Sequence, residues 1–271
     1  MIALRKISEF IGCARALGPD NRAKLAILWR QTRNLRVSLG VQSHRPSEVF
    51  TLRTTFGTLH FRDNFGDITN LTDLLFGEVY RLPDAPGDGV VIDVGANIGM
   101  AAVWFNSKYP GRAIHCFEPL ADNARMIALN APSAHINPVA VGATRGTATL
   151  AVDADQVMAS TIPYEHAAGT LQVNVISLDD YVVRLGIKRV AILKIDTEGM
   201  ELDVLAGAKT TLDRTDSISI ETHGRERHQK TIRALAEAGC RLQREAFDGS
   251  TGLVFAAGPA ASRSHLHQPG S

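Results

Sequence analysis

The feature that most constrains the fold is an apolar run that leads straight into a glycine-containing turn, Val-Ile-Asp-Val-Gly-Ala-Asn-Ile-Gly at residues 91–99. The run predicts a buried strand, and apolar residues at core spacing over 98–108 predict a helix directly after the turn. The same strand-then-helix pattern returns at residues 113–117 and 120–130. Strands that alternate with helices predict βαβ units and a mostly parallel sheet.

The alternation continues to the end of the chain. Strands are expected at 136–141, 190–195 and 217–220, and a closing hairpin at 241–247 and 252–257 supplies one antiparallel edge strand. We therefore expect an α/β fold with a doubly wound, mostly parallel seven-stranded sheet of the Rossmann-like kind.

The segment before this core has a different pattern, and a cluster of Pro, Asp and Gly at 83–89 separates the two. Upstream of the cluster, the spacing predicts helices over 3–17, 21–39 and 67–80 and a β-hairpin over 49–62. The predicted organisation is an accessory region at 1–86, a core domain at 87–257 and a disordered tail at 258–271, which is rich in Ser, Pro, His and Gly.

Charge and cysteine usage exclude several classes of protein. The net charge of +1 argues against a nucleic-acid binder, and no stretch reaches the ~20 apolar residues of a membrane span. Cys13, Cys116 and Cys240 lie far apart, which favours free thiols in a reducing compartment. Charges near the N-terminus do not suit a secretory signal. We expect a cytoplasmic protein with no nucleic-acid partner.

The positive charge is concentrated at the front, where residues 1–46 hold nine Arg or Lys and only two acids. One interpretation is a solvated basic face on the 21–39 helix. The other is a surface for an anionic acceptor, a carrier or a membrane, so peripheral membrane contact through this segment stays open. A homo-oligomer is also compatible with the sequence.

The turn after the first strand and an acid after the second predict a nucleoside site. Gly95 permits a sharp turn with room for a ligand, and Gly99 permits close helix–strand packing. Glu118 ends the second strand, where a carboxylate can accept hydrogen bonds from a ribose diol. A nicotinamide-dependent oxidoreductase would share these features, but its usual turn is G-x-G-x-x-G. Here Asn97 replaces the middle glycine, which suits a ligand without a pyrophosphate.

S-adenosylmethionine (SAM) is such a ligand, and its amino-acid part can meet Asp93 and the amides of the turn. The adenine is placed beside the small residues after the third strand. The predicted cofactor-binding residues are Asp93, Gly95, Ala96, Asn97, Gly99, Glu118, Val141 and Gly142.

A second conspicuous motif is Lys-Ile-Asp-Thr-Glu-Gly at 194–199. The chain also contains Asp-Val-Gly-Ala-Asn-Ile-Gly at 93–99 and Phe-Glu-Pro at 117–119. Together these motifs closely resemble the FkbM-type methyltransferase family over residues 56–222. The resemblance implies the seven-stranded class I SAM methyltransferase fold. It also implies O-methylation of a sugar, glycolipid or natural-product hydroxyl, with a small-molecule or glycan acceptor. The basic N-terminal helices are not part of the shared pattern.

The acceptor is expected over the ends of the fourth and fifth strands, because the donor lies over the first three. We predict Asp196, His223 and Lys194 as catalytic residues. Asp196 can orient the acceptor or take its proton, and His223 can act as a base if its imidazole is neutral. Lys194, in a central strand, needs a partner such as Asp196, Glu198 or Glu221. Glu198 can instead cap the helix that begins near Gly199.

Several alternatives stay open from the sequence. A divalent ion such as Mg²⁺ is possible but not expected, and its ligands would be Asp196, Glu221 and His223. The other functions considered are an NAD(P)-dependent oxidoreductase, an N-methyltransferase and a non-catalytic SAM-binding module.

Overall fold

The computed structural model describes residues 2–38, 45–153, 159–160 and 167–264 of the chain. The chain divides into two compact units. The first comprises Met1–Tyr80, Ile98–Pro110 and Arg125–Pro132, and the second comprises Arg81–Asn97, Gly111–Ala124 and Ser133–Ser271. This division differs from the single boundary predicted at residue 86, because the helix after the first core strand belongs to the first unit.

The first unit begins with two helices, α1 (Ile2–Leu17) and α2 (Asn21–Ser38), which pack on one another. The antiparallel strands β1 (Arg45–Thr54) and β2 (Gly57–Asp63) follow, as predicted. Next come α3 (Phe65–Asn70), the π-helical segment η1 (Leu71–Phe76) and, later in the chain, α4 (Met100–Lys108). The helix predicted at 67–80 thus ends at Phe76. Asn130 joins distant parts of this unit by donating to the carbonyl groups of His60 and Ile98.

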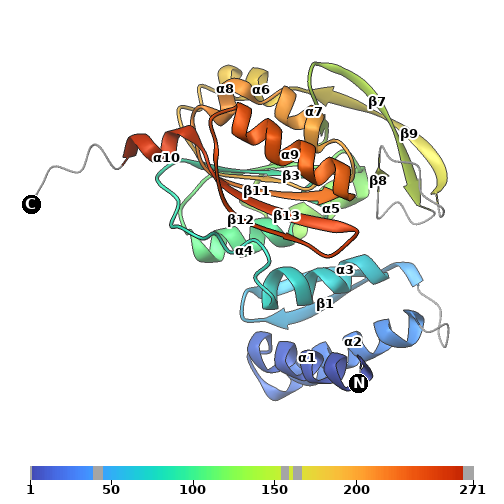
Figure 1. Cartoon of the computed structure of the whole chain (residues 1–271). Helices are drawn as coiled ribbons and strands as arrows, with labels where there is room; N and C mark the ends of the chain where they lie inside the picture. Colours follow the sequence, from blue (N-terminus) through green and yellow to red (C-terminus); the bar gives the residue numbers. More distant parts are fainter. Residues whose placement is uncertain (1, 39–44, 154–158, 161–166, 265–271) are drawn as a thin grey trace, which may run out of the picture. The chain divides into compact units, whose positions relative to one another are not determined.

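The second unit contains the seven-stranded sheet, in the order β12-β13-β11-β10-β3-β4-β5 (Figure 1). The strands are β3 (Val90–Val94), β4 (Ile114–Phe117), β5 (His135–Asn137), β10 (Val190–Ile195), β11 (Thr215–His223), β12 (Arg241–Phe247) and β13 (Thr251–Ala257). Strands β5, β4, β3, β10 and β11 are parallel, and β13 is antiparallel to both of its neighbours. The chain runs outward from β3 in both directions, so the doubly wound α/β fold is confirmed.

Three details of the sheet differ from the expectation. The antiparallel strand β13 lies between β11 and β12 rather than at the edge. Strand β11 continues to His223, since its last residues pair with β13. The segment predicted as one strand at 136–141 is divided between β5 in the main sheet and β6 (Ala140–Val141) in a second sheet.

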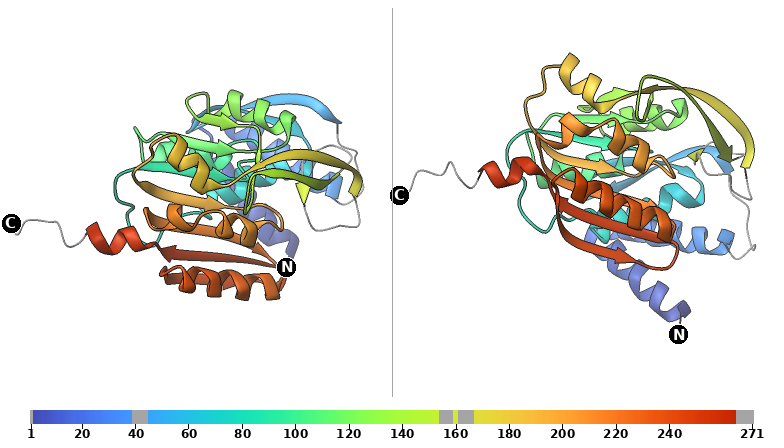
Figure 2. Two further views of the ribbon diagram at one scale, coloured as in Figure 1. Left: turned by 90° about the horizontal axis from the view of Figure 1, so that it is seen from above. Right: turned by 45° about the horizontal axis from the view of Figure 1, so that its top comes forward.

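The second sheet has the order β6-β9-β7-β8 and was not predicted from the sequence. Its strands β7 (Gly146–Asp153) and β9 (Ala167–Ile176) form a long antiparallel pair with the short strand β8 (Ala159–Ser160) at the edge. In Figures 1 and 2 this pair extends well beyond the main sheet. Leu171, Val173 and Val175 alternate with polar residues, a period-two strand pattern that the prediction missed.

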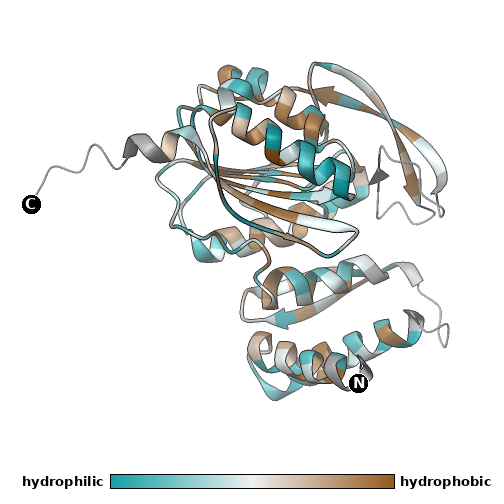
Figure 3. Ribbon diagram, in the orientation of Figure 1, coloured by the Kyte–Doolittle hydropathy of each residue, from teal (hydrophilic) through white to brown (hydrophobic). Residues whose placement is uncertain are grey.

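The core of the second unit lies between its helices and the main sheet, and Leu193, Ile195, Val204 and Ile220 are fully buried there. Its helices are α6 (Leu178–Arg184), α7 (Glu201–Ala206), α8 (Lys209–Leu212), α9 (Arg225–Glu237) and α10 (Pro259–Ser264), while α5 (Ala121–Asn130) spans both units. Figure 3 shows hydrophilic and hydrophobic residues mixed along α9, as expected for a helix that covers a sheet. Helix α10 corrects the disordered tail predicted from 258; residues 265–271 lie outside the described residues.

Candidate active site

The shape of the first glycine turn is set by the neighbouring strand. Gly95 follows β3 with φ +76°, a left-handed conformation that residues other than glycine rarely adopt. A Cβ atom on Gly95 would overlap the main-chain carbonyl oxygen of Asp196, which follows β10. The close approach of β10 therefore already requires this glycine, whereas the sequence suggested that a ligand needs the space.

The amide groups of this turn are already used inside the protein. Gly95 and Ala96 both donate to the carbonyl oxygen of Phe117, at 3.0 and 3.1 Å. Asn97 donates its amide to Glu118 Oε2 at 2.9 Å. These three amides already have acceptors inside the protein, and their contact with a cofactor stays a prediction.

Three more residues that we predicted at the cofactor site serve packing. Gly99 faces helix α5 rather than a strand, since a Cβ there would lie 3.3 Å from Ile127 Cα. Val141 is 2% exposed, and Gly142 donates its amide to the carbonyl oxygen of Ile176 at 3.0 Å. The chain's own contacts hold these residues, and the adenine position beside Val141 and Gly142 stays a prediction.

Glu118 is the acid that the sequence placed at the end of the second core strand, and it is buried. Its two carboxylate oxygens accept the amides of Asn97 and Leu120, each at 2.9 Å. Burial raises the pKa of Glu118 to about 7, although these hydrogen bonds act in the opposite direction. Each oxygen keeps lone-pair capacity for a further donor. The adjacent Asn97 Oδ1 is buried and has no hydrogen-bond partner in the described part of the chain.

Lys194 lies beneath the turn with its side chain 3% exposed. Its Nζ donates to the carbonyl oxygen of Gly95 at 2.7 Å and lies 3.0 Å from Asp93 Oδ1 and 3.6 Å from Asp196 Oδ2. Burial lowers the pKa of Lys194, but the charges of Asp93 and Asp196 outweigh it and raise the pKa above its ordinary value. Lys194 and Asp93 are thus a buried cation and its partner that join β10 to β3.

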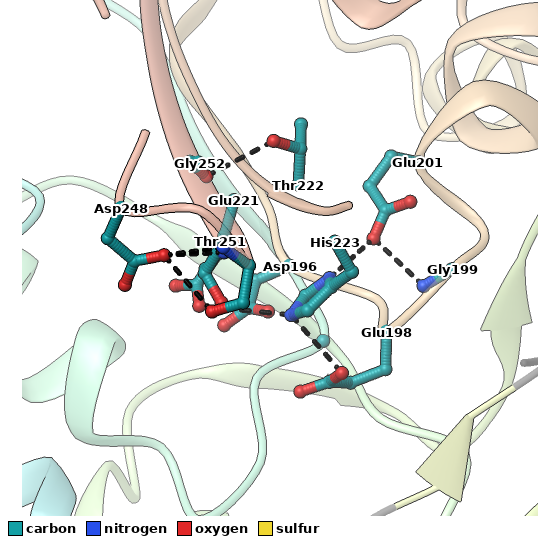
Figure 4. A network of polar contacts seen from close by, with 12 residues as sticks. Asp196, Glu198, Gly199, Glu201, Glu221, Thr222, His223, Asp248, Thr251 and Gly252 are labelled. Atoms are coloured by element: carbon teal, nitrogen blue, oxygen red, sulfur yellow. Dashed lines mark hydrogen bonds and ion pairs between the residues drawn. The ribbon is translucent and has the colours of Figure 1, made fainter. Parts of the chain in front are cut away.

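The ends of β10 and β11, the loop before α7 and the first residue of α7 bring four carboxylates around His223 (Figure 4). His223 Nδ1 lies 3.1 Å from Glu201 Oε1, and Nε2 lies 3.2 Å from Glu198 Oε2 and 3.9 Å from Glu221 Oε1. Asp196, Glu221 and His223 have ligand atoms within 4.8 Å of one another. We call Asp196, Glu198, Glu201, Glu221 and His223 the acid–histidine cluster.

The members of the cluster set each other's protonation. Burial alone would lower the pKa of His223, but the hydrogen bond to Glu201 and the charges of Glu198 and Asp196 raise it to about 9. The charge of Asp196, then burial, raises the pKa of Glu221 to about 8. Burial, then the charge of Asp196, raises the pKa of Glu198 to about 7. These interactions favour the protonated form of His223 near neutral pH, whereas the sequence suggested a neutral imidazole base.

The methyltransferase FkbM domain model matches residues 93–242, more than half of the chain. The chain belongs to the FkbM methyltransferase family. Hexuronic acid methyltransferase AglP of Haloferax volcanii is 26% identical over 159 residues, which are 58% of this chain and 65% of that protein. The 31-O-demethyl-FK506 methyltransferase FkbM of Streptomyces tacrolimicus is 27% identical over 158 residues, 46% of this chain and 60% of that protein. The chain thus spans less than two thirds of the length of both relatives.

Among solved structures, fibrillarin of Aeropyrum pernix in complex with S-adenosyl-L-methionine aligns with 80% of this chain and 86% of its own. The TM-score is 0.46 and the identity is 13%. The segment that matches the FkbM domain contains the turn, Glu118 and the whole acid–histidine cluster.

Glu201 is the residue of this FkbM-family site that sequence reasoning missed. Its carboxylate is fully buried, and Oε1 accepts from the amide of Gly199 at 2.8 Å as well as from His223. A signal was present, because Glu201 shares one helical stripe with the apolar residues Val204, Leu205 and Ala208. An acid on the core face of a helix needs a buried partner.

Two predicted roles in the Lys-Ile-Asp-Thr-Glu-Gly segment change with the structure. Glu198 does not cap α7, because the N-cap residue is Met200, which makes no side-chain hydrogen bond there. The carboxylate of Glu198 contacts His223 instead. Glu198 also has φ +49°, an uncommon conformation for a residue with a side chain. The first partner of Lys194 is Asp93 on the adjacent strand, which sequence reasoning had assigned to the cofactor.

No helix of the described part of the chain combines the length and the apolarity needed to cross a membrane.

Proposed function

We propose that this protein transfers a methyl group from SAM to a hydroxyl group of a sugar, glycolipid or secondary metabolite. The observation that carries the proposal is the arrangement at one edge of the sheet. Strands β3, β4, β10 and β11 are parallel, so their carboxyl ends lie at the same edge, where open α/β sheets bind ligands. That edge combines a buried acid suited to a ribose diol with a cluster of proton-accepting carboxylates.

Glu118 and Asn97 are the residues that fit the cofactor. Glu118 is fixed by two backbone amides and can accept hydrogen bonds from two neighbouring hydroxyl groups, each strengthened by its negative charge. Asn97 Oδ1, buried and without a partner, can accept a hydrogen bond from an ammonium group. SAM supplies an electrophilic methyl carbon when it is bound.

The residues of the chain then have to align the acceptor and take its proton. We assign the proton-accepting role to the carboxylate of Asp196, which is 26% exposed, with Glu221 beside it. When the acceptor hydroxyl is methylated, its proton would pass to the carboxylate of Asp196. Protonated His223 holds the carboxylates in place, and Lys194 holds the turn at Gly95 through the carbonyl oxygen of that residue.

The names of the two relatives support the class of acceptor. One methylates a hexuronic acid, and the name of the other refers to an oxygen atom of FK506. A small-molecule or glycan hydroxyl is therefore the acceptor we propose for this chain. Methylation of an amine at the same cluster is the nearest alternative, and the two differ in the acceptor atom only.

Binding measurements test the cofactor half of the proposal. We expect calorimetry to give micromolar affinity for SAM and for S-adenosylhomocysteine, and no binding of NADH. Glu118→Ala should weaken SAM binding about a hundredfold, because it removes two charge-assisted hydrogen bonds. Glu226→Ala is the matched control, since Glu226 is an exposed acid paired with Lys230 on α9. Unchanged SAM affinity in Glu118→Ala, or tight binding of NADH, would contradict the proposal.

A divalent ion is the second mechanistic candidate, because Asp196, Glu221 and His223 present their ligand atoms within 4.8 Å of one another. Two carboxylates and an imidazole suit Mn²⁺ or Zn²⁺ as well as Mg²⁺. Turnover that survives dialysis against EDTA would exclude this candidate. Turnover that is lost and then restored by one of these ions would support it over the metal-free mechanism.

A further inference from the structure

Helix α2 carries an exposed stripe that the proposed chemistry does not use. Leu25 and Trp29, which are 67% and 56% exposed, lie four residues apart on one face of the helix. Arg22 and Arg36 continue the same face, one turn before Leu25 and two turns after Trp29, and both are exposed. We call these four residues the α2 stripe.

The stripe is held rigidly from the other side of the helix. Ala23, Ile27 and Gln31 are buried on the opposite face. Arg30 places its guanidinium 3.5 Å from the ring centre of Phe50 and 4.8 Å from that of Trp29. The indole is thus fixed next to a cation while more than half of it faces solvent.

The charged residues of α2 itself are all basic, and two of them, Arg30 and Arg33, are paired with Asp63. Helix α2 contains five Arg or Lys residues and no acid. The whole chain has 29 basic and 28 acidic residues, and residues 1–46 hold nine of the basic and two of the acidic ones. This segment therefore has a formal charge of +7, and the remainder of the chain has −6. A negatively charged surface attracts this segment and repels the rest of the protein, which orients the molecule.

We propose that the α2 stripe docks on the surface of an anionic lipid bilayer. Leucine and tryptophan flanked by arginine are the composition of a helix that lies in a membrane interface, with the apolar side chains among the headgroups and acyl chains. The absence of any acid on α2 complements anionic lipid headgroups. A second copy of this chain is a poor occupant, because two arginine-flanked faces of the same charge repel each other.

Vesicle binding of the full chain tests the proposal. We expect the protein to sediment with vesicles of phosphatidylcholine containing 30% phosphatidylserine, but not with phosphatidylcholine alone, and to be released by about 0.5 M NaCl. The chain has two tryptophans, and Trp104 is buried at 2% exposure. A blue shift of the fluorescence on adding vesicles therefore reports on Trp29.

Variants separate the electrostatic contribution of the arginines from the apolar contribution of Leu25 and Trp29. Arg22→Glu with Arg36→Glu should lower the partition coefficient at least about 25-fold, from about fivefold for each of the two lost cations. Leu25→Ser with Trp29→Ser should lower it at least about ten-fold. Val183→Ser with Leu185→Ser is the matched control, because these residues are 67% and 50% exposed at the end of α6, and it should bind as the wild type does.

Three results would overturn the proposal. The first is no binding to anionic vesicles with an unshifted Trp29 spectrum. The second is equal binding by the wild type and both stripe variants. The third is a dimer in ultracentrifugation that only the Leu25/Trp29 variant loses, which would assign the stripe to a second copy. Circular dichroism and thermal melting of each variant show that a loss of binding is not a loss of the fold.

Discussion

The two ends of the candidate site are built in different ways. At the cofactor end, Glu118 is held by the backbone amides of Asn97 and Leu120, and the main-chain carbonyl oxygen of Asp196 leaves no room for a side chain at Gly95. At the acceptor end, the acid–histidine cluster consists of side chains from β11 and from the segments that follow β10, and they contact one another. The backbone therefore determines the first end, and the charges of neighbouring side chains determine the second.

This difference has a chemical consequence. A carboxylate held by fixed amides offers the same hydrogen-bond geometry to every cofactor molecule, which suits recognition. A cluster whose members shift each other's pKa values to about 7, 8 and 9 can exchange protons near neutral pH, which suits proton transfer. We expect binding and turnover to respond separately to substitutions at the two ends.

The largest separation is expected for Asp196→Asn. Loss of the proton-accepting carboxylate should lower kcat about a thousandfold, within the usual range for a general base. SAM affinity should stay within about twofold, because Lys194 keeps Asp93 and Gly95 as partners. Single-turnover kinetics and calorimetry on the same preparation measure both quantities. A loss of SAM binding as large as the loss of kcat would break the distinction between the two ends.

A smaller effect is expected for Glu201→Gln, which sharpens the role of the cluster. The amide oxygen can still accept from His223 and Gly199, but the negative charge that raises the pKa of His223 is lost. We expect kcat to fall about tenfold and the alkaline limb of its pH profile to move from about 9 toward lower pH.

Glu245→Gln is the matched control, since Glu245 Oε2 lies 3.2 Å from Nε2 of another histidine, His228, outside the cluster. It should leave the pH profile unchanged. If kcat of Glu201→Gln falls equally at every pH, without a shift in the pH profile, Glu201 does not set the pKa of His223 and has a structural role only.

The smallest effect concerns the cofactor end and its pH dependence. Because burial raises the pKa of Glu118 to about 7, its carboxylate is mostly protonated at pH 6 and mostly ionised at pH 8. An acid must be ionised to accept both ribose hydrogen bonds, so SAM affinity should rise several-fold between these pH values. Calorimetry at both pH values, with Asp196→Asn as a comparison, measures this. The rise in SAM affinity with pH should persist in Asp196→Asn. Its absence in that variant would show that the acceptor end also controls cofactor binding.

Much of the fold could be predicted because it is encoded in local patterns. The apolar strand at 90–94 ends in a turn that needs a glycine, and Glu118 follows the next strand, so both features of the cofactor end are near in sequence to the elements that place them. The strands β7 and β9 were missed although apolar and polar residues alternate over 171–175, because they belong to a second sheet outside the βαβ units. The strand at 136–141 was misjudged because its two halves join different sheets.

The acceptor end could be predicted only as a set of residue types. Asp196, Glu221 and His223 were expected together because parallel strands end at one edge, and the structure brings their ligand atoms within 4.8 Å. The protonation of His223 could not be predicted, since it depends on distances to Glu201 and Glu198 that only the folded loop sets.

The sequence by itself determined the α/β alternation, the turn at Gly95, the acid at the end of the next strand and the motifs of the family. These depend on the order and spacing of residues along one stretch of chain. Only the tertiary structure decided that Lys194 on β10 pairs with Asp93 on the adjacent strand β3 and that Glu201 lies against His223. Strand register and electrostatic coupling arise between segments far apart in the sequence, and no local pattern specifies the distances on which they depend.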